Sequence, residues 1–323
     1  MVTIPDQYFG KVEFYAVDNA GNVENQNTSA TTIVVDSTAG TWNAAYAYKK
    51  TVEEGEAVYT DTNGVQYTRF DTTVTLFMDE TFFDLSLEAL KLTEKGKASA
   101  AAPTISGDDS RGEWTKGEDG IWTIDLTLTT EGDHDMVMEY TNRSGLASEK
   151  YSQKIVIDRT APVAQIEWAE AERVEKDGTR YYKNNAEKPA TATLTVVDKN
   201  FNPDKAVVSD LYEAVNGTQE TKSVPAVWTQ DEQDSTKWTA VVTLTEEGDH
   251  KLTVDVTDWA GNVMETKTTD KVIIDYTAPV LEELVFNETD VVNTNKALDR
   301  DYYKGEVVAT VKIIERNFDE KDL

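Results

Sequence analysis

The stretch TDWAGNVMETKTTDKVIIDYTAP, residues 257–279, carries the pattern that decides the fold. It contains an Asp, an Ala-Gly-Asn-Val turn, a polar segment, a β-branched run and a closing Asp-x-Thr-Ala. The same skeleton stands at residues 16–40, in AVDNAGNVENQNTSATTIVVDSTAG. A chain that repeats such a pattern is built from copies of one structural unit.

Several independent markers return with one period of about 117 residues and in one order. Asp-x-Thr-Ala begins at Asp36, Asp158 and Asp275, and Glu-Gly-Asp-His begins at Glu131 and Glu247. A third marker occurs as Asp79-Glu-Thr-Phe82, Asp198-Lys-Asn-Phe201 and Glu315-Arg-Asn-Phe318. The agreement of unrelated markers indicates a true internal repeat.

Each copy reads as β-structure, because its apolar runs are short, β-branched and alternating, with Gly, Asn and Asp between them. We expect strands at 72–79, 122–129, 134–141 and 154–158 in one copy, and at 190–198, 238–245, 250–258 and 271–275 in the other. No sustained helical period is present, and the polar run at 93–103 reads as a loop insertion. About seven strands per copy predict an all-β fold of tandem immunoglobulin-like Greek-key β-sandwiches.

The repeat predicts four parts. Residues 1–38 are the C-terminal part of a truncated domain, 39–160 and 161–277 are complete domains, and 278–323 are the N-terminal part of another. We call 39–160 the first repeat and 161–277 the second repeat. Because both ends fall inside a repeat, we expect a longer array, with neighbouring repeats of the same polypeptide as partners. A lone hairpin is marginal in water, so we expect the end segments to be mobile or prone to edge pairing.

Composition excludes several classes of partner. The chain has 60 acidic and 31 basic residues and a formal net charge of −29. Nucleic acid is therefore not an expected partner, because phosphate binding needs basic patches. No apolar run reaches the length of a membrane helix, so no membrane insertion is expected. The chain has no cysteine, which excludes disulfides and thiolate metal sites.

The chain resembles the bacterial immunoglobulin-like domains that stand in tandem along large surface adhesins and cell-wall proteins. The Asp-x-Ala-Gly-Asn turn followed by Asp-x-Thr-Ala-Pro carries the resemblance. The segments VVDKNFNPDKAVV and IIERNFDEKDL resemble a variety found in surface proteins of Firmicutes. The resemblance implies an extracellular, cell-surface stalk or adhesin segment that meets a host or surface ligand. In some relatives calcium stiffens the domain junctions.

Topology predicts where the acidic motifs meet. In an immunoglobulin sandwich the B–C and F–G loops lie at the pole where the chain enters, and the last strand leaves at the other pole. Asp158 should therefore meet Asp198 with Asn200 from one loop of the next domain, and Asp258 with Asn262 from another. Calcium takes six to eight oxygen ligands, so these five residues form our candidate calcium site. The alternative is that each Asp only closes its own turn.

The same logic predicts unequal junctions. The earlier junction offers Asp36 and Asp79, but Asn142, followed by Arg143, stands where Asp258 stands later. We expect the missing carboxylate and the added guanidinium to weaken any cation site there. The later junction offers Asp275 and Glu315.

No catalytic residue is expected. The only histidines, His134 and His250, hold the same repeat position, which favours a structural role. Trp114 and Trp122 return as Trp228 and Trp238, which favours packing over a carbohydrate platform. Three functions stay open: a non-catalytic spacer, a glycan- or protein-binding module that uses loops such as 91–120, and an accessory domain of a secreted polysaccharide-degrading enzyme.

Overall fold

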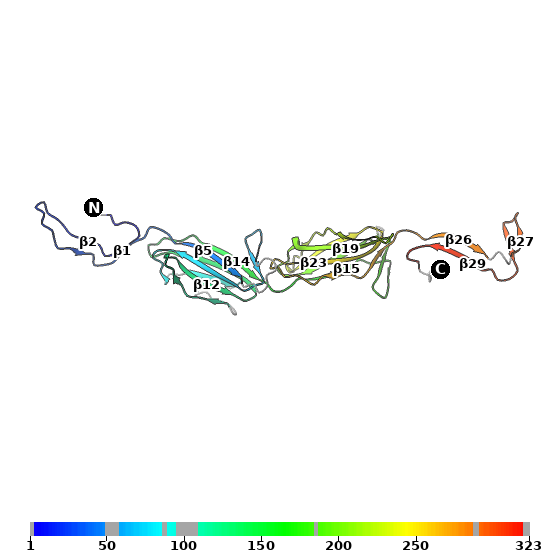
Figure 1. The fold of residues 1–323 in the computed structure, drawn as a ribbon, viewed down its shortest axis with the longest axis horizontal. Coiled ribbons are helices and arrows are strands. Elements are labelled where there is room, and N and C mark those ends of the chain that lie inside the picture. The colour runs from blue at the N-terminus through cyan, green and yellow to red at the C-terminus, as the bar shows by residue number, and fades with distance from the viewer. Residues whose placement is uncertain are drawn as a thin grey trace.

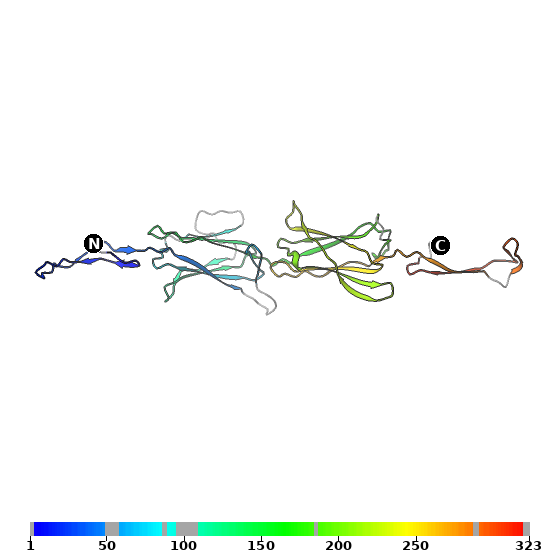
Figure 2. The same cartoon turned by 90° about the horizontal axis from the view of Figure 1, so that it is seen from above.

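The computed structural model describes residues 3–48, 58–85, 89–94, 109–183, 187–286 and 291–318. The described chain is elongated, with two packed bodies arranged end to end and a thin hairpin region at each extremity (Figures 1 and 2). The described regular structure is almost entirely β-strand and includes a 3-10 turn at Pro203–Lys205. The predicted all-β fold is confirmed. Among the described residues, no helix is long and apolar enough to cross a membrane.

The first repeat forms two sheets of five strands each. One has the order β10-β12-β8-β5, with β11 also paired to β12, and the other has the order β6-β7-β14-β13-β9. The bounds are β5 Thr41–Tyr48, β6 Tyr59–Thr60, β7 Gln66–Thr68, β8 Thr72–Asp79, β9 Ala89–Glu94, β10 Ser110–Arg111, β11 Thr115–Lys116, β12 Trp122–Leu128, β13 Gly132–Glu139 and β14 Tyr151–Ile157.

The second repeat forms a four-stranded sheet of order β15-β18-β22-β21 and a seven-stranded sheet of order β16-β17-β25-β23-β19-β20, in which β24 also pairs with β23. The bounds are β15 Val163–Trp168, β16 Arg173–Val174, β17 Arg180–Tyr182, β18 Ala190–Val197, β19 Ala206–Ala214, β20 Gln219–Ser223, β21 Thr229–Gln230, β22 Lys237–Leu244, β23 Gly248–Val256, β24 Lys267–Thr268 and β25 Val272–Ile274. Strand neighbours in space are often distant in sequence, which is compatible with the predicted Greek key.

Alternating strands supply the core of each repeat. Buried and less buried residues alternate along β8 and along β18, because successive side chains of a strand point to opposite faces. Buried side chains from both sheets of the second repeat form one hydrophobic cluster, which includes Leu194 and Val254. The buried clusters of the first repeat contain only residues of that repeat, such as Leu76 and Met136. The two bodies therefore have separate cores.

The eight expected strands are all present, with ends displaced by up to three residues. The expectation of about seven strands per repeat is wrong, because two-residue edge strands such as β6, β10 and β16 join the sheets. The loop expected at 93–103 begins too early, since Thr93 and Glu94 belong to β9. Its residues 95–103 lie outside the described part of the chain.

The end regions are hairpins with little burial. They contain β1 Tyr8–Gly10, β2 Glu13–Phe14, β3 Asn27–Thr28 and β4 Ile33–Val35 at one extremity, and β26 Val280–Phe286, β27 Val291–Asn295, β28 Arg300–Tyr303 and β29 Ala309–Ile314 at the other. Their sheets have two strands each. Large apolar side chains such as Phe9 and Leu281 are more than half exposed. Within the part of the chain that the structure describes, these strands have no second layer that would bury them.

The repeated tryptophans pack as expected. Trp114 and Trp122 lie against Phe83, with ring centroids 5.0 and 5.6 Å away. Trp228 and Trp238 lie against Phe201, each with a centroid distance of 5.2 Å. These aromatic clusters fix the loop that follows β8 in one repeat and the loop that follows β18 in the other.

The two histidines hold equivalent buried positions. The His250 ring contacts the Asp210 carboxylate through Nδ1 at 2.8 Å and the Glu246 carbonyl oxygen through Nε2 at 2.9 Å. The His134 ring lies 3.3 Å from the Asp109 carboxylate and 2.8 Å from the Thr130 carbonyl oxygen. Each histidine thus ties its strand to neighbouring segments of the same repeat.

Candidate metal centre

In the Asp-x-Thr motif, one carboxylate oxygen of the Asp points away from the repeat that the motif closes. Asp158 follows β14, and its Oδ1 accepts a hydrogen bond from the Thr160 backbone N–H at 2.9 Å. Asp36 and Asp275 accept the same bond from the Thr two residues later, at 3.2 Å in both cases. This local turn leaves the Oδ2 of Asp158 facing the second repeat, where the Asn200 side chain donates to it at 2.5 Å.

The loop after β18 supplies the second carboxylate. Asp198 accepts a hydrogen bond from the Asn200 backbone N–H at 2.7 Å. Asn200 therefore connects two carboxylates, because its backbone bonds Asp198 and its side chain bonds Asp158. The neighbouring Phe201 is buried in the aromatic cluster and anchors the loop.

The Asp-Trp-Ala-Gly-Asn turn supplies the third carboxylate. Asp258 accepts from the Asn262 backbone N–H and from the Asn262 side chain, both at 2.8 Å. The Asn262 side chain also donates to the Asp158 carbonyl oxygen at 2.9 Å, which links the two repeats. Gly261 has a φ of +84°, and a Cβ there would lie 2.8 Å from the Tyr59 ring. Only glycine satisfies both conditions.

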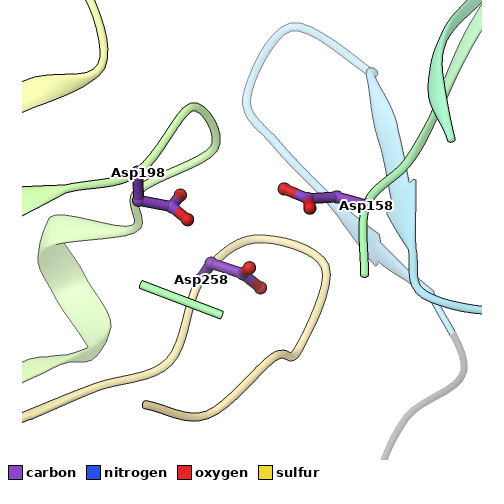
Figure 3. A group of neighbouring side chains, drawn as sticks. All are labelled: Asp158, Asp198 and Asp258. Atoms are coloured by element: carbon purple, nitrogen blue, oxygen red, sulfur yellow. The ribbon is translucent and has the colours of Figure 1, made fainter. Parts of the chain in front are cut away.

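Figure 3 shows the three carboxylates of Asp158, Asp198 and Asp258 converging from three separate segments. One oxygen from each lies within 4.8 Å of the others, and the residues are only 5, 6 and 2% exposed. Calcium–oxygen bonds of about 2.3–2.6 Å let oxygens on opposite sides of one ion lie roughly 5 Å apart. The spacing therefore fits a single cation. We call this group the Asp158 joint.

The Asp158 joint brings three carboxylates together in a buried environment. Burial and the charges of Asp258 and Asp158 raise the pKa of Asp198 to about 7, despite the Asn200 hydrogen bond. Burial also raises the pKa of Asp258 to about 6; the Asn262 hydrogen bonds oppose this and the Asp158 charge adds to it. Within the described residues, none of these three carboxylates forms an ion pair with a Lys or Arg.

Other contacts around the joint hold the two repeats together. Trp259 stacks on Tyr67 with a centroid distance of 5.8 Å, and the Arg69 guanidinium donates to the Gly261 carbonyl oxygen at 3.0 Å. Lys199 reaches across to Asp133 at 2.8 Å. The Asp258 turn thus sits on the β6–β7 hairpin of the first repeat, and the acidic cluster lies beside a packed interface.

The earlier joint has a different third member. The Asn142 side chain donates to Asp36 Oδ2 at 2.6 Å and to the Thr38 carbonyl oxygen at 3.3 Å. The expectation that Asp79 faces this joint is wrong: Asp79 is exposed, whereas Glu80 is 3% exposed. Glu80 accepts from the Phe82 backbone N–H, as Asp198 does from Asn200. We call Asp36, Glu80 and Asn142 the Asp36 joint.

The misplacement of Asp79 has a physical origin. Phe83 fills the pocket between two tryptophans that Phe201 fills in the second repeat, so the alignment of Phe82 with Phe201 is shifted by one residue. A sequence signal was present, because residues 82 and 83 are both phenylalanine. Burial raises the pKa of Glu80, with smaller contributions from Asp36 and Asp79, against the Phe82 hydrogen bond.

Arg143 contacts an acid outside the Asp36 joint. Its Nε pairs with the Asp84 carboxylate, so the guanidinium contacts a different acid from the two at the joint. The exchange of a carboxylate for the Asn142 amide remains a reason to expect a weaker cation site there. An amide donates hydrogen bonds to a carboxylate, and it does not add negative charge.

A third joint, at Asp275, has counterparts of two of the three carboxylates of the Asp158 joint, namely Asp275 and Glu315. The Asn317 side chain donates to Asp275 Oδ2, as Asn200 does to Asp158, and Glu315 accepts from the Asn317 backbone N–H at 2.9 Å. Arg316 and Lys271 both pair with Asp249, as Lys199 and Lys154 pair with Asp133. No described residue takes the place of Asp258 there.

Comparison with known proteins gives no further guide, because no protein-family model and no curated protein matches the chain.

Proposed function

We propose that this chain is a non-catalytic spacer of a bacterial surface adhesin or cell-wall protein, stiffened by calcium at the Asp158 joint. The observation that carries the proposal is the convergence of three buried carboxylates between two end-to-end sandwiches. A spacer needs a defined angle between its domains, and a cation that binds both domains at once restrains that angle.

The electrostatics of the joint favour a cation. Buried carboxylates without a compensating positive charge are costly, since burial and like charge both disfavour the ionised form. Without a cation, Asp198 and Asp258 relieve the repulsion by taking up protons near neutral pH. A divalent ion supplies the missing positive charge, and the oxygen-only ligand set suits calcium.

The proposed ligands are Asp158, Asp198 and Asp258, with the side-chain oxygens of Asn200 and Asn262 as further candidates. Each asparagine already donates through its Nδ2, so its Oδ1 is the atom a cation would use. Extracellular calcium modules bind with dissociation constants of about 0.1–1 mM. An affinity in that range would suit a cell-surface location.

Titration calorimetry of the whole chain with calcium tests the proposal. We expect one binding event, and we expect Asp258→Ala to weaken it at least about 100-fold, because ligand charge helps to set affinity. Asp79→Ala serves as the matched control, since that aspartate is exposed and faces no joint. Absence of binding at millimolar calcium, or equal binding by Asp258→Ala, would show that the carboxylates only close turns.

A further inference from the structure

The surface around Tyr181 has the same form as the surface that receives the Asp258 turn at the Asp158 joint. β7 pairs in parallel with β14, which places Tyr67 opposite Val156; β17 pairs in parallel with β25, which places Tyr181 opposite Ile273. The strand partners of both tyrosines, Val156 and Ile273, therefore lie two residues before the Asp that leaves the repeat. Arg69 and Lys183 follow the tyrosines at the same spacing.

The two equivalent surfaces differ in what covers them. Trp259 stacks on Tyr67, and Arg69 donates to the Gly261 carbonyl oxygen. At the other surface a hollow of about 770 Å³ is lined by Arg173, Tyr181, Lys183, Asp275, Asn317 and neighbouring residues. The receiving side is already formed there, because Asn317 holds Asp275 as Asn200 holds Asp158.

We infer that this hollow is a docking surface for a β-hairpin whose turn reads Asp-Trp-Ala-Gly-Asn, carried by another sandwich domain. The inference rests on the proposed spacer role and extends it to a second interface. The tryptophan is expected to stack on Tyr181, and Lys183 to face the turn carbonyl that Arg69 contacts in the internal copy. The turn aspartate would meet Asp275 and Glu315, so calcium should strengthen the docking.

The chain also carries a similar turn that lacks the aromatic residue. Asp18 accepts hydrogen bonds from the Ala20 and Asn22 backbone N–H groups, both at 2.9 Å, and from the Asn22 side chain at 2.8 Å. This matches the Asp258 turn except that Asn19 replaces the tryptophan. A second copy of the chain could present this turn, but it offers no ring for Tyr181. We therefore assign the hollow to the tryptophan-bearing turn.

The test uses the whole, isotope-labelled chain and a cyclised peptide that carries residues 257–263 as a hairpin. With calcium present, we expect the peptide to shift the NMR signals of Tyr181 and Asp275. Tyr181→Ala in the chain, or Trp259→Ala in the peptide, should weaken binding about tenfold, because an aromatic stack is lost. The peptide variant cannot disturb the fold of the protein. Tyr276→Ala is the control, since that tyrosine is 60% exposed and does not line the hollow.

Two results would overturn the inference. One is the absence of shifts at millimolar peptide. The other is equal binding of a Trp259→Asn peptide, which reproduces the Asp18 turn and would assign the surface to a second copy. Calcium calorimetry at the Asp158 joint is expected to be unchanged by Tyr181→Ala, so failure of the docking surface and failure of the calcium proposal give different readings.

Discussion

The Asp36 joint and the Asp158 joint use the same local turns but stabilise the contact between their carboxylates differently. At the Asp36 joint the Asn142 amide donates directly to Asp36, and two carboxylates are present. At the Asp158 joint the equivalent position is Asp258, and three buried carboxylates face one another. One side-chain group in the turn, an amide or a carboxylate, separates a joint with two carboxylates and an amide donor from a joint with three buried carboxylates.

If calcium binds as proposed, the comparison predicts that stiffness differs from joint to joint along the repeat array. The backbone bonds of the turns are retained in both joints, since Leu146 N–H bonds Asn142 Oδ1 as Asn262 N–H bonds Asp258 Oδ1. Because the turn survives the exchange, the identity of this residue can vary without loss of the fold. Calcium would then govern one joint and leave its neighbour unaffected.

Exchange of the deciding residue should have the largest effect. Asn142→Asp gives the Asp36 joint a third carboxylate and removes the amide that bonds Asp36. We expect the calcium-free protein to lose about 3 kcal/mol of stability, a magnitude typical of an uncompensated buried charge. We also expect calcium calorimetry to report two sites in place of one.

The reverse exchange is the matched control. Asp258→Asn should abolish the calcium response and raise the melting temperature in EDTA, because it removes one of three repelling charges. An Asn142→Asp protein that is as stable as wild type and binds no additional calcium would contradict the comparison.

The pH dependence of stability should be marked without calcium and much weaker with calcium. In EDTA the folded-state pKa values of Asp198 and Asp258, about 7 and 6, lie above the ordinary value of 3.8. The folded form then binds more protons than the unfolded form across this interval, so stability falls as pH rises from about 4 to 7. Above that interval the loss is complete.

Calcium should remove most of this loss, because it binds the ionised carboxylates and competes with protons. Melting temperatures measured at about pH 5 and pH 8, in EDTA and in calcium, check the expectation. Glu80, whose pKa is also raised, should keep a smaller dependence of the same sign in both solutions. A calcium-free protein that gains stability from pH 5 to pH 8 would contradict the assignment.

The smallest effect on stability is expected from the Lys199–Asp133 ion pair beside the Asp158 joint. Burial raises the pKa of Asp133, but hydrogen bonds and charges from Lys199 and Lys154 outweigh it and hold the pKa at about 2. Lys199→Ala leaves Lys154 in place, and Lys199 is half exposed, so we expect a loss below about 1 kcal/mol. Urea unfolding at low and high salt measures this loss of stability, which should shrink as salt screens the ion pair.

Phe82→Ala is the control variant. Phe82 stacks on Phe9 at the Asp36 joint, and this contact is apolar, so its loss should show no such salt dependence.

Much of the candidate site could be predicted from the sequence, because the repeat period locates equivalent turns. Asp158, Asp198 and Asp258 are adjacent to strands that alternate clearly, and the chain order then brings their ends to one pole. The same reasoning failed at Glu80, since two adjacent phenylalanines fit the motif and only packing between Trp114 and Trp122 selects Phe83. Short edge strands also escaped, because two residues carry no period. The pair of Tyr67 with Trp259 could not be predicted, as it depends on how one repeat is oriented against the next.

The parallel pairing of β17 with β25 has a mechanical consequence. β17 lies near the start of the second repeat and β25 at its end, and three residue pairs connect them side by side. When the two extremities of the chain are pulled apart, parallel neighbours at the entry and exit of a domain slide past each other, so their hydrogen bonds are loaded together in shear. β7 and β14 repeat this geometry in the first repeat. In each sandwich the parallel strand pair therefore resists pulling, and it lies beside the joint that connects this sandwich to the next domain.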